Sequence, residues 1–162
     1  MTNNDIFRQL RYILNLSDQQ VVETFLAADM TTTTQQVKQW LINDEDKQLF
    51  IQNSDLSYFL DGLININRGR RKDYKPTFNS NLTNNEIFKK LKIALNLKDT
   101  DLLDIFKLVN VNVGKHELSA FFRSPGKGQY QEMGNQYMRN FLHGLQVKLR
   151  PSTDDSADDK KN

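Results

Sequence analysis

The chain contains no cysteine, and this absence excludes several kinds of site at once. Without thiols there are no disulfides, no thiolate-bound metals and no cysteine nucleophile. Histidine is scarce as well: His116 and His143 are the only two, and neither belongs to a His-x-x-x-His motif that could bind a metal. The sequence therefore predicts no catalytic residues, no metal site and no cofactor, and we expect a protein that is not an enzyme.

Long apolar runs are also missing. No stretch approaches the ~18 apolar residues that a membrane-spanning helix needs. The first residues, Met-Thr-Asn-Asn-Asp, lack the basic start and apolar segment of a secretory signal. We therefore expect no membrane partner and a cytoplasmic location.

The net charge of the whole chain is only +2, but its segments differ strongly. Residues 1–68 hold five Lys and Arg against nine Asp and Glu, a net charge of −4. Residues 69–82 have a net charge of +3, and residues 83–150 one of +5. Such an asymmetry either marks a partner-binding surface or means that the two halves attract each other.

Two stretches of the sequence are near copies of each other. Thr-Asn-Asn-Asp-Ile-Phe-Arg-Gln-Leu-Arg at 2–11 recurs as Thr-Asn-Asn-Glu-Ile-Phe-Lys-Lys-Leu-Lys at 83–92. Between 2–18 and 83–99, ten of seventeen positions are identical. Phe-Leu-Asp-Gly-Leu at 59–63 returns as Phe-Leu-His-Gly-Leu at 141–145. The chain is therefore a tandem duplication.

Each copy is predicted to form four helices, so the fold class is all-α, with two tandem copies of a four-helix unit. Apolar residues recur at helical spacing, as Leu56, Phe59, Leu60 and Leu63 do in the fourth helix of the first copy. No segment shows the alternating pattern of a half-buried strand.

Short polar residues mark the expected helix ends. Thr83 stands three residues before Glu86, the spacing of a capping box at a helix start. Asn15 is expected to end the first helix, because asparagine tolerates the left-handed conformation of a C-cap. Asp18 and Asp99 are predicted to cap the second helix of each copy.

Gly62 and Gly144 interrupt the fourth helix of each copy at a cost of ~1 kcal/mol each relative to alanine. Because both copies keep this costly residue, we expect two backbones to approach closely there. The junction between the two units is one place where such an approach would occur.

The chain divides into a first helical repeat (1–68), a basic linker (69–82), a second helical repeat (83–150) and a tail (151–162). Gly69 and Pro76 punctuate the linker. The tail is mostly Ser, Asp, Lys and Asn and has almost nothing to bury, so we expect it to be disordered.

The paired starts Asn-Asn-Asp-Ile-Phe and Asn-Asn-Glu-Ile-Phe, with Phe-Leu-x-Gly-Leu late in each copy, resemble a bacterial family known as YehS-like. The resemblance covers about residues 1–150. It implies a small, soluble, helical tandem-repeat protein. It brings no catalytic residues and no function, because that family is uncharacterised.

Two hypotheses for the function follow from the sequence. The first is a non-enzymatic helical interaction module that binds a protein or peptide partner. Two similar units packed as a pseudo-symmetric pair form a groove at their junction, which suits a peptide or a helix. The sequence names neither the partner nor the oligomeric state.

The second hypothesis is nucleic-acid binding. The second and third helices of each copy, expected at about 18–28 and 34–43 in the first, resemble a helix-turn-helix pair whose second helix reads the DNA. In the first copy Gln36 and Gln39 are placed to contact base edges. Cations of the linker and the second copy would contact phosphates. These are Arg68, Arg70, Arg71, Lys72, Lys115 and Arg123.

Overall fold

The computed structural model describes residues 1–44 and 46–151, and these residues form eight α-helices and no strand. The first copy contains α1 (Asn3–Ile13), α2 (Asp18–Leu26), α3 (Thr34–Leu41) and α4 (Asn53–Arg68). The second contains α5 (Asn84–Ala94), α6 (Asp99–Lys107), α7 (Lys115–Phe121) and α8 (Asn135–Leu149). The predicted all-α duplication is confirmed. Residues 152–162 of the predicted tail lie outside the described residues.

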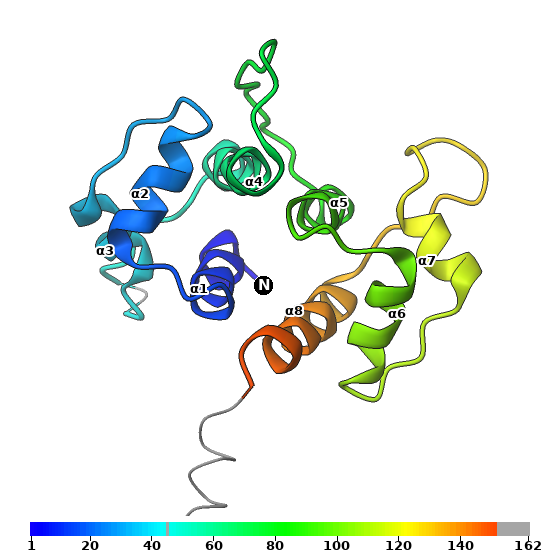
Figure 1. Ribbon diagram of the computed structural model, residues 1–162. Helices are drawn as coiled ribbons and strands as arrows, with labels where there is room; N and C mark the ends of the chain where they lie inside the picture. Colours follow the sequence, from blue (N-terminus) through cyan, green and yellow to red (C-terminus); the bar gives the residue numbers. More distant parts are fainter. Residues whose placement is uncertain (45, 152–162) are drawn as a thin grey trace, which may run out of the picture.

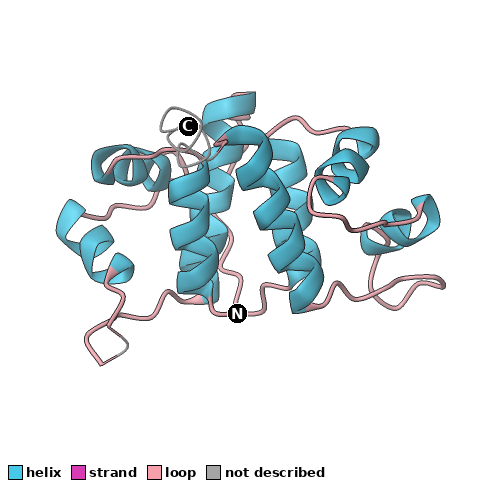
Figure 2. Ribbon diagram, turned by 90° about the horizontal axis from the view of Figure 1, so that it is seen from below, coloured by secondary structure: helices cyan, strands magenta, loops and turns pink. Residues whose placement is uncertain are grey.

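Four helices, α1, α4, α5 and α8, form the centre of the molecule, with α2 and α3 on one side and α6 and α7 on the other (Figures 1 and 2). Hydrogen bonds show how they are directed. Asn3 Nδ2 donates to the carbonyl of Ile51 at 3.0 Å, so α1 and α4 begin side by side, and the second copy repeats this bond. Asn67 Nδ2 donates to the carbonyl of Ala94 at 3.0 Å, so α4 and α5 end side by side. The central helices therefore run parallel.

Each copy is packed around a cluster of aromatic rings at its centre. Phe7 and Phe59 meet edge to face with centroids 5.1 Å apart, and Phe88 and Phe141 repeat this contact at 4.7 Å. All four rings are fully buried, and burial of apolar surface is the main favourable term in folding. No helix among the described residues is long and apolar enough to cross a membrane.

A buried asparagine joins the start of each copy to the loop before its last helix. Asn4 Nδ2 donates to the carbonyls of Trp40 (3.1 Å) and Leu49 (2.8 Å), and its Oδ1 accepts from the Ile51 amide (3.0 Å). Asn85 makes the same three kinds of bond in the second copy. The repeated Asn-Asn pair is therefore a structural motif, because its side chains satisfy main-chain groups of the loop.

The two helical glycines lie where backbones touch, as predicted, but both contacts are inside a copy. A Cβ on Gly62 would come within 1.9 Å of the carbonyl oxygen of Thr24, so α4 packs directly on α2. A Cβ on Gly144 would come within 2.3 Å of the carbonyl oxygen of Ile105, so α8 packs on α6 in the same way. The junction between the copies is not involved.

The helix ends confirm the left-handed asparagines, which lie one residue past each C-cap, and correct two N-caps. Asn15 and its counterpart in the second copy are both left-handed, with φ of 53°. The predictions for Asp18 and Asp99 were wrong, because each is the first helical residue and the cap lies one residue earlier. At α2 the Ser17 hydroxyl accepts from the Gln20 amide at 3.1 Å, a bond that a serine in the cap position makes readily.

The capping box predicted at Thr83 and Glu86 is only half formed. The Thr83 hydroxyl accepts from the Glu86 amide at 3.2 Å. The Glu86 carboxylate instead accepts from Asn79 Nδ2 at 2.9 Å, which ties the linker to the start of α5.

Candidate interaction surface

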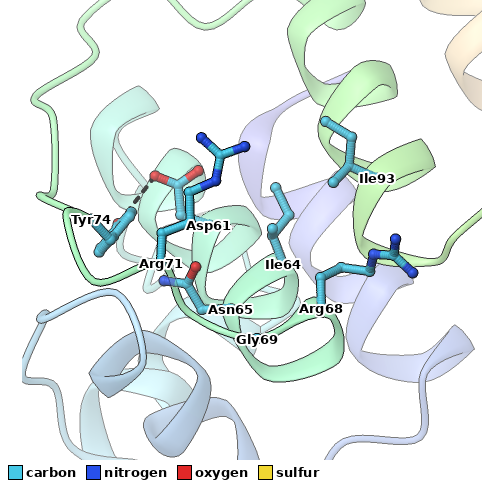
Figure 3. Close-up of a pocket in the computed structure, with 8 residues that line it drawn as sticks. All are labelled: Asp61, Ile64, Asn65, Arg68, Gly69, Arg71, Tyr74 and Ile93. Carbon is cyan, nitrogen blue, oxygen red and sulfur yellow. Dashed lines mark hydrogen bonds between the residues drawn. The ribbon is translucent and has the colours of Figure 1, made fainter.

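The outer face of α4 is hollowed near its C-terminal end, where it meets the linker and α5 (Figure 3). The hollow has a volume of about 500 Å³. Its floor includes Ile64 and Ile93, and in Figure 3 the side chain of Ile64 lies between those of Arg71 and Arg68, which point in different directions. The full lining is Asp61, Ile64, Asn65, Arg68, Gly69, Arg71, Tyr74 and Ile93.

A second hollow, of about 360 Å³, continues this surface over α5. It shares Arg68 and Ile93 with the first, so the two adjoin. We call the two hollows together the basic trough. The second hollow adds the following residues to its lining: Lys89, Lys92, Asn96, Leu97 and Phe122.

A polar cluster around Asp61 lies at one end of the trough. The Asp61 carboxylate, with its side chain 16% exposed, accepts from Lys90 Nζ and from the Tyr74 hydroxyl at 3.2 Å. Burial raises the pKa of the Tyr74 phenol above its ordinary value, and the negative charge of Asp61 raises it further. Tyr74 therefore stays neutral and donates. Because Lys90 balances the Asp61 charge, this carboxylate repels an anion in the trough only weakly.

Three cations that line the trough have no carboxylate partner among the described residues: Arg68, Arg71 and Lys89. The fourth cation of the lining, Lys92, is paired with Asp99 at 2.8 Å. Unpaired positive charges above an apolar floor form a surface that attracts a negatively charged, partly apolar ligand.

Both aromatic rings at the trough already have partners within the chain. Phe122 stacks on Phe88 with ring centroids 5.0 Å apart and an interplanar angle of 13°, and Lys92 Nζ lies 4.7 Å from the Phe122 centroid. The guanidinium of Arg70 lies 5.0 Å from the centroid of Tyr74. Proteins that hold single-stranded nucleic acid stack its bases on open aromatic faces, whereas these two rings are already in contact with another ring or with a cation.

The structure disperses the cations that the sequence assigned to phosphate contacts. Arg68 and Arg71 line the trough, whereas Arg70 donates from Nη1 and Nη2 to the two carboxylate oxygens of Asp29, at 2.6 and 2.7 Å. This hydrogen-bonded pair lowers the pKa of Asp29. The remaining three are exposed at separate places: Lys72 on the linker, Lys115 at the start of α7, and Arg123 in a smaller hollow that shares Lys89 and Phe122 with the trough.

The helices that resembled a helix-turn-helix differ from one in two ways. Residues 27–33 separate α2 from α3, a longer connection than the three or four residues of that motif. Gln36 and Gln39 are half-buried on α3, which lies on the opposite side of the bundle from α7 (Figure 1). The two would-be recognition helices thus do not share a surface.

Arg150 is the counterpart of Arg68 in the second copy, and it is bound by its own chain. Its guanidinium donates to the carbonyl of Tyr12 at 2.7 Å and to Asn15 Oδ1 at 2.9 Å, and lies 4.2 Å from the Tyr12 ring centroid. The α1–α8 face is therefore closed where the α4–α5 face is open. The sequence aligns Arg68 with Arg150, which marks both as candidates for the same role. It did not show that Arg150 is hydrogen-bonded to its own chain whereas Arg68 has no carboxylate partner among the described residues.

Both histidines are exposed, His116 on α7 and His143 on α8. Within residues 1–44 and 46–151, no three His, Cys, Asp or Glu side chains gather as metal ligands would.

Comparison with known proteins gives two matches and one negative result. A family model described as "Protein of unknown function (DUF1456)" matches residues 3–69 and again residues 84–150. The chain is 35% identical over 152 residues to the "Uncharacterized protein YehS" of Escherichia coli (strain K12), covering 91% of this chain and 96% of that protein. No solved structure matches the chain.

Proposed function

This chain belongs to the DUF1456 family of proteins of unknown function, and from that premise we propose that it is a non-enzymatic interaction module that binds an acidic segment of a partner protein in the basic trough. A cytoplasmic location is part of the proposal, and fractionation of cells that contain the tagged chain would test it.

The observation that carries the proposal is the set of unpaired cations above an apolar floor. Arg68, Arg71 and Lys89 face the trough without a carboxylate partner among the described residues, whereas Arg70, Lys90 and Lys92 have one. Arginine matches a carboxylate geometrically, because its planar guanidinium donates two parallel hydrogen bonds. Isoleucine at the floor offers surface that an acidic peptide with apolar residues would cover.

A protein partner fits this surface better than nucleic acid does. Both rings at the trough already have a stacked ring or a cation as partner, so a base that stacked there would compete with those contacts. Isoleucine side chains at the floor contribute nothing to a phosphate contact. Arg123 is the observation that favours nucleic acid as the second candidate, since it extends the row of cations beyond Lys89.

Fluorescence anisotropy with labelled ligands at ~50 mM salt tests the proposal, because electrostatic contacts are strongest at low salt. A peptide rich in Asp and Glu should bind at micromolar concentrations. Arg68→Glu should weaken that binding at least tenfold, since it removes a favourable charge contact and adds a repulsive one.

Lys38→Glu is the matched control, because it makes the same change in net charge at an exposed site on α3, away from the trough. It should change the affinity for the peptide less than twofold. Equal losses in the two variants would mean that only net charge matters and would contradict the proposal. Tighter binding of short single-stranded or duplex oligonucleotides than of the peptide would favour the second candidate.

A further inference from the structure

The arrangement of side chains in the trough says more about the segment it binds. Resting on the function proposed above, we infer that the partner segment carries an apolar side chain between two carboxylates, and that each chain holds one such segment in spite of its duplication.

The apolar floor of the trough lies beside its unpaired arginines. Ile64 lies between Arg68 and Arg71, and Ile93 from α5 completes the same hollow (Figure 3). The Ile93 side chain is 42% exposed although the core lies close by. An exposed isoleucine beside unpaired arginines is a place where a ligand gains from covering apolar surface and from meeting charge together.

The side chains of Arg68 and Arg71 are directed apart (Figure 3). Because they lie on either side of Ile64 and point in different directions, a single carboxylate does not satisfy both. A ligand that pairs with both must bring one carboxylate to each side, and its middle then lies over the isoleucines. A polar side chain in that middle position would be desolvated without a partner, whereas an apolar one would be stabilised there.

The α1–α8 face, which the repeat makes equivalent to the α4–α5 face, lacks both the isoleucine floor and the unpaired arginine within the described residues. Gln146 stands at the position of Ile64, and Tyr12 stands at that of Ile93. The Tyr12 ring is covered by Arg150, whose guanidinium is bound to the main chain of α1. Among the described residues, the α1–α8 face therefore has neither the isoleucine floor nor an unbound counterpart of Arg68, and we expect one site per chain.

Isothermal titration with two synthetic peptides of equal length and charge tests the inference. One contains a single Asp-Leu-Glu between short Gly-Ser spacers, and the other a single Asp-Ser-Glu. The leucine peptide should bind about fivefold more tightly, which corresponds to partial burial of one apolar side chain. The expected stoichiometry is one peptide per chain.

Two isoleucine variants locate the effect. Ile93→Ser should remove the advantage of the leucine peptide and leave the affinity for the serine peptide unchanged. Ile66→Ser is the matched control, because Ile66 is 54% exposed on α4 and does not line the trough. It should alter neither affinity. Thermal unfolding of both variants checks that each is folded.

The outcomes separate this inference from the proposed function. If neither peptide binds, the proposed function fails, and this inference fails with it. If both bind equally, or if Ile93→Ser has no effect on the difference, acidic binding stands and the apolar requirement is overturned. Two peptides bound per chain would overturn the single site.

Discussion

Asn4 illustrates how one side chain holds a copy together. It is 1% exposed, and its three hydrogen bonds satisfy main-chain groups on both sides of the α3–α4 loop. Asn4→Ala should lower the free energy of unfolding by about 3 kcal/mol, because buried donors and acceptors would lose their partners. Urea denaturation measures this as a lower midpoint with an unchanged slope.

Asn112→Ala serves as the control for this prediction, because Asn112 is exposed in the α6–α7 loop. It should change the stability by less than about 0.5 kcal/mol. A comparably small effect of Asn4→Ala would mean that water replaces the lost bonds and that the loop does not depend on this residue.

For single residues, the sequence revealed which ones recur in the two copies but not which groups they hydrogen-bond. The Asn-Asn pair was visible in both copies as part of a helix start. The acceptors of Asn4 lie 36 and 45 residues further along the chain, and no local spacing indicates them. Where partners are local, as for the left-handed Asn15, the prediction was confirmed. Asp18 was mistaken for a cap because Ser17 beside it is an equally good one.

The contact between α4 and α2 leads to a prediction about a single methyl group. Gly62→Ala would place a Cβ 1.9 Å from the carbonyl oxygen of Thr24, so one helix must move. Although alanine favours a helix by ~1 kcal/mol over glycine, we expect a net destabilisation of about 1–3 kcal/mol. Gly144→Ala should act in the same way against Ile105.

Gly128→Ala is the control for the glycine series, because a Cβ there meets nothing within 4 Å and the residue lies in the α7–α8 loop, outside any helix. It should leave the stability unchanged or raise it by up to about 1 kcal/mol, because alanine restricts the unfolded chain. If thermal unfolding showed Gly62→Ala to be as stable as the natural chain, the close approach of α4 to α2 would be wrong.

Helices were the part of the fold that the sequence predicted best, since helical periodicity and capping residues are local signals. The neighbours of each helix were not predicted. The two glycines indicated close packing, but the helix on the other side lies elsewhere in the chain, and the junction between copies was only one choice. The hydrophobic stripe of α4 shows which of its faces is buried. It does not show that α2 is the helix that packs against this face.

For the whole molecule, the duplication was evident from sequence and the departure from symmetry was not. α4 packs along α5 more extensively than α1 packs along α8, although the repeat makes these pairs equivalent. The basic trough lies on the closely packed pair, and its linker residues Arg71 and Tyr74 have no copy within the described residues. Arg68 and Arg71 were among the predicted cations and Lys89 was not. The separation into paired and unpaired cations depends on the positions of carboxylates such as Asp29 and Asp61.

The parallel direction of α4 and α5 makes the linker a return path, and its length decides whether one chain can complete its own bundle. The linker must run back along α5, whose 11 residues are about 16 Å long.

Deleting residues 70–81 leaves a linker that can span roughly 14 Å at most between the end of α4 and the start of α5, which is too short. The second repeat should then dock on the first repeat of another molecule, giving a domain-swapped dimer. Light scattering should show twice the mass of the natural chain, whereas a Gly-Ser linker of the original length should keep it unchanged. An unaltered mass with unaltered thermal unfolding would contradict the return path.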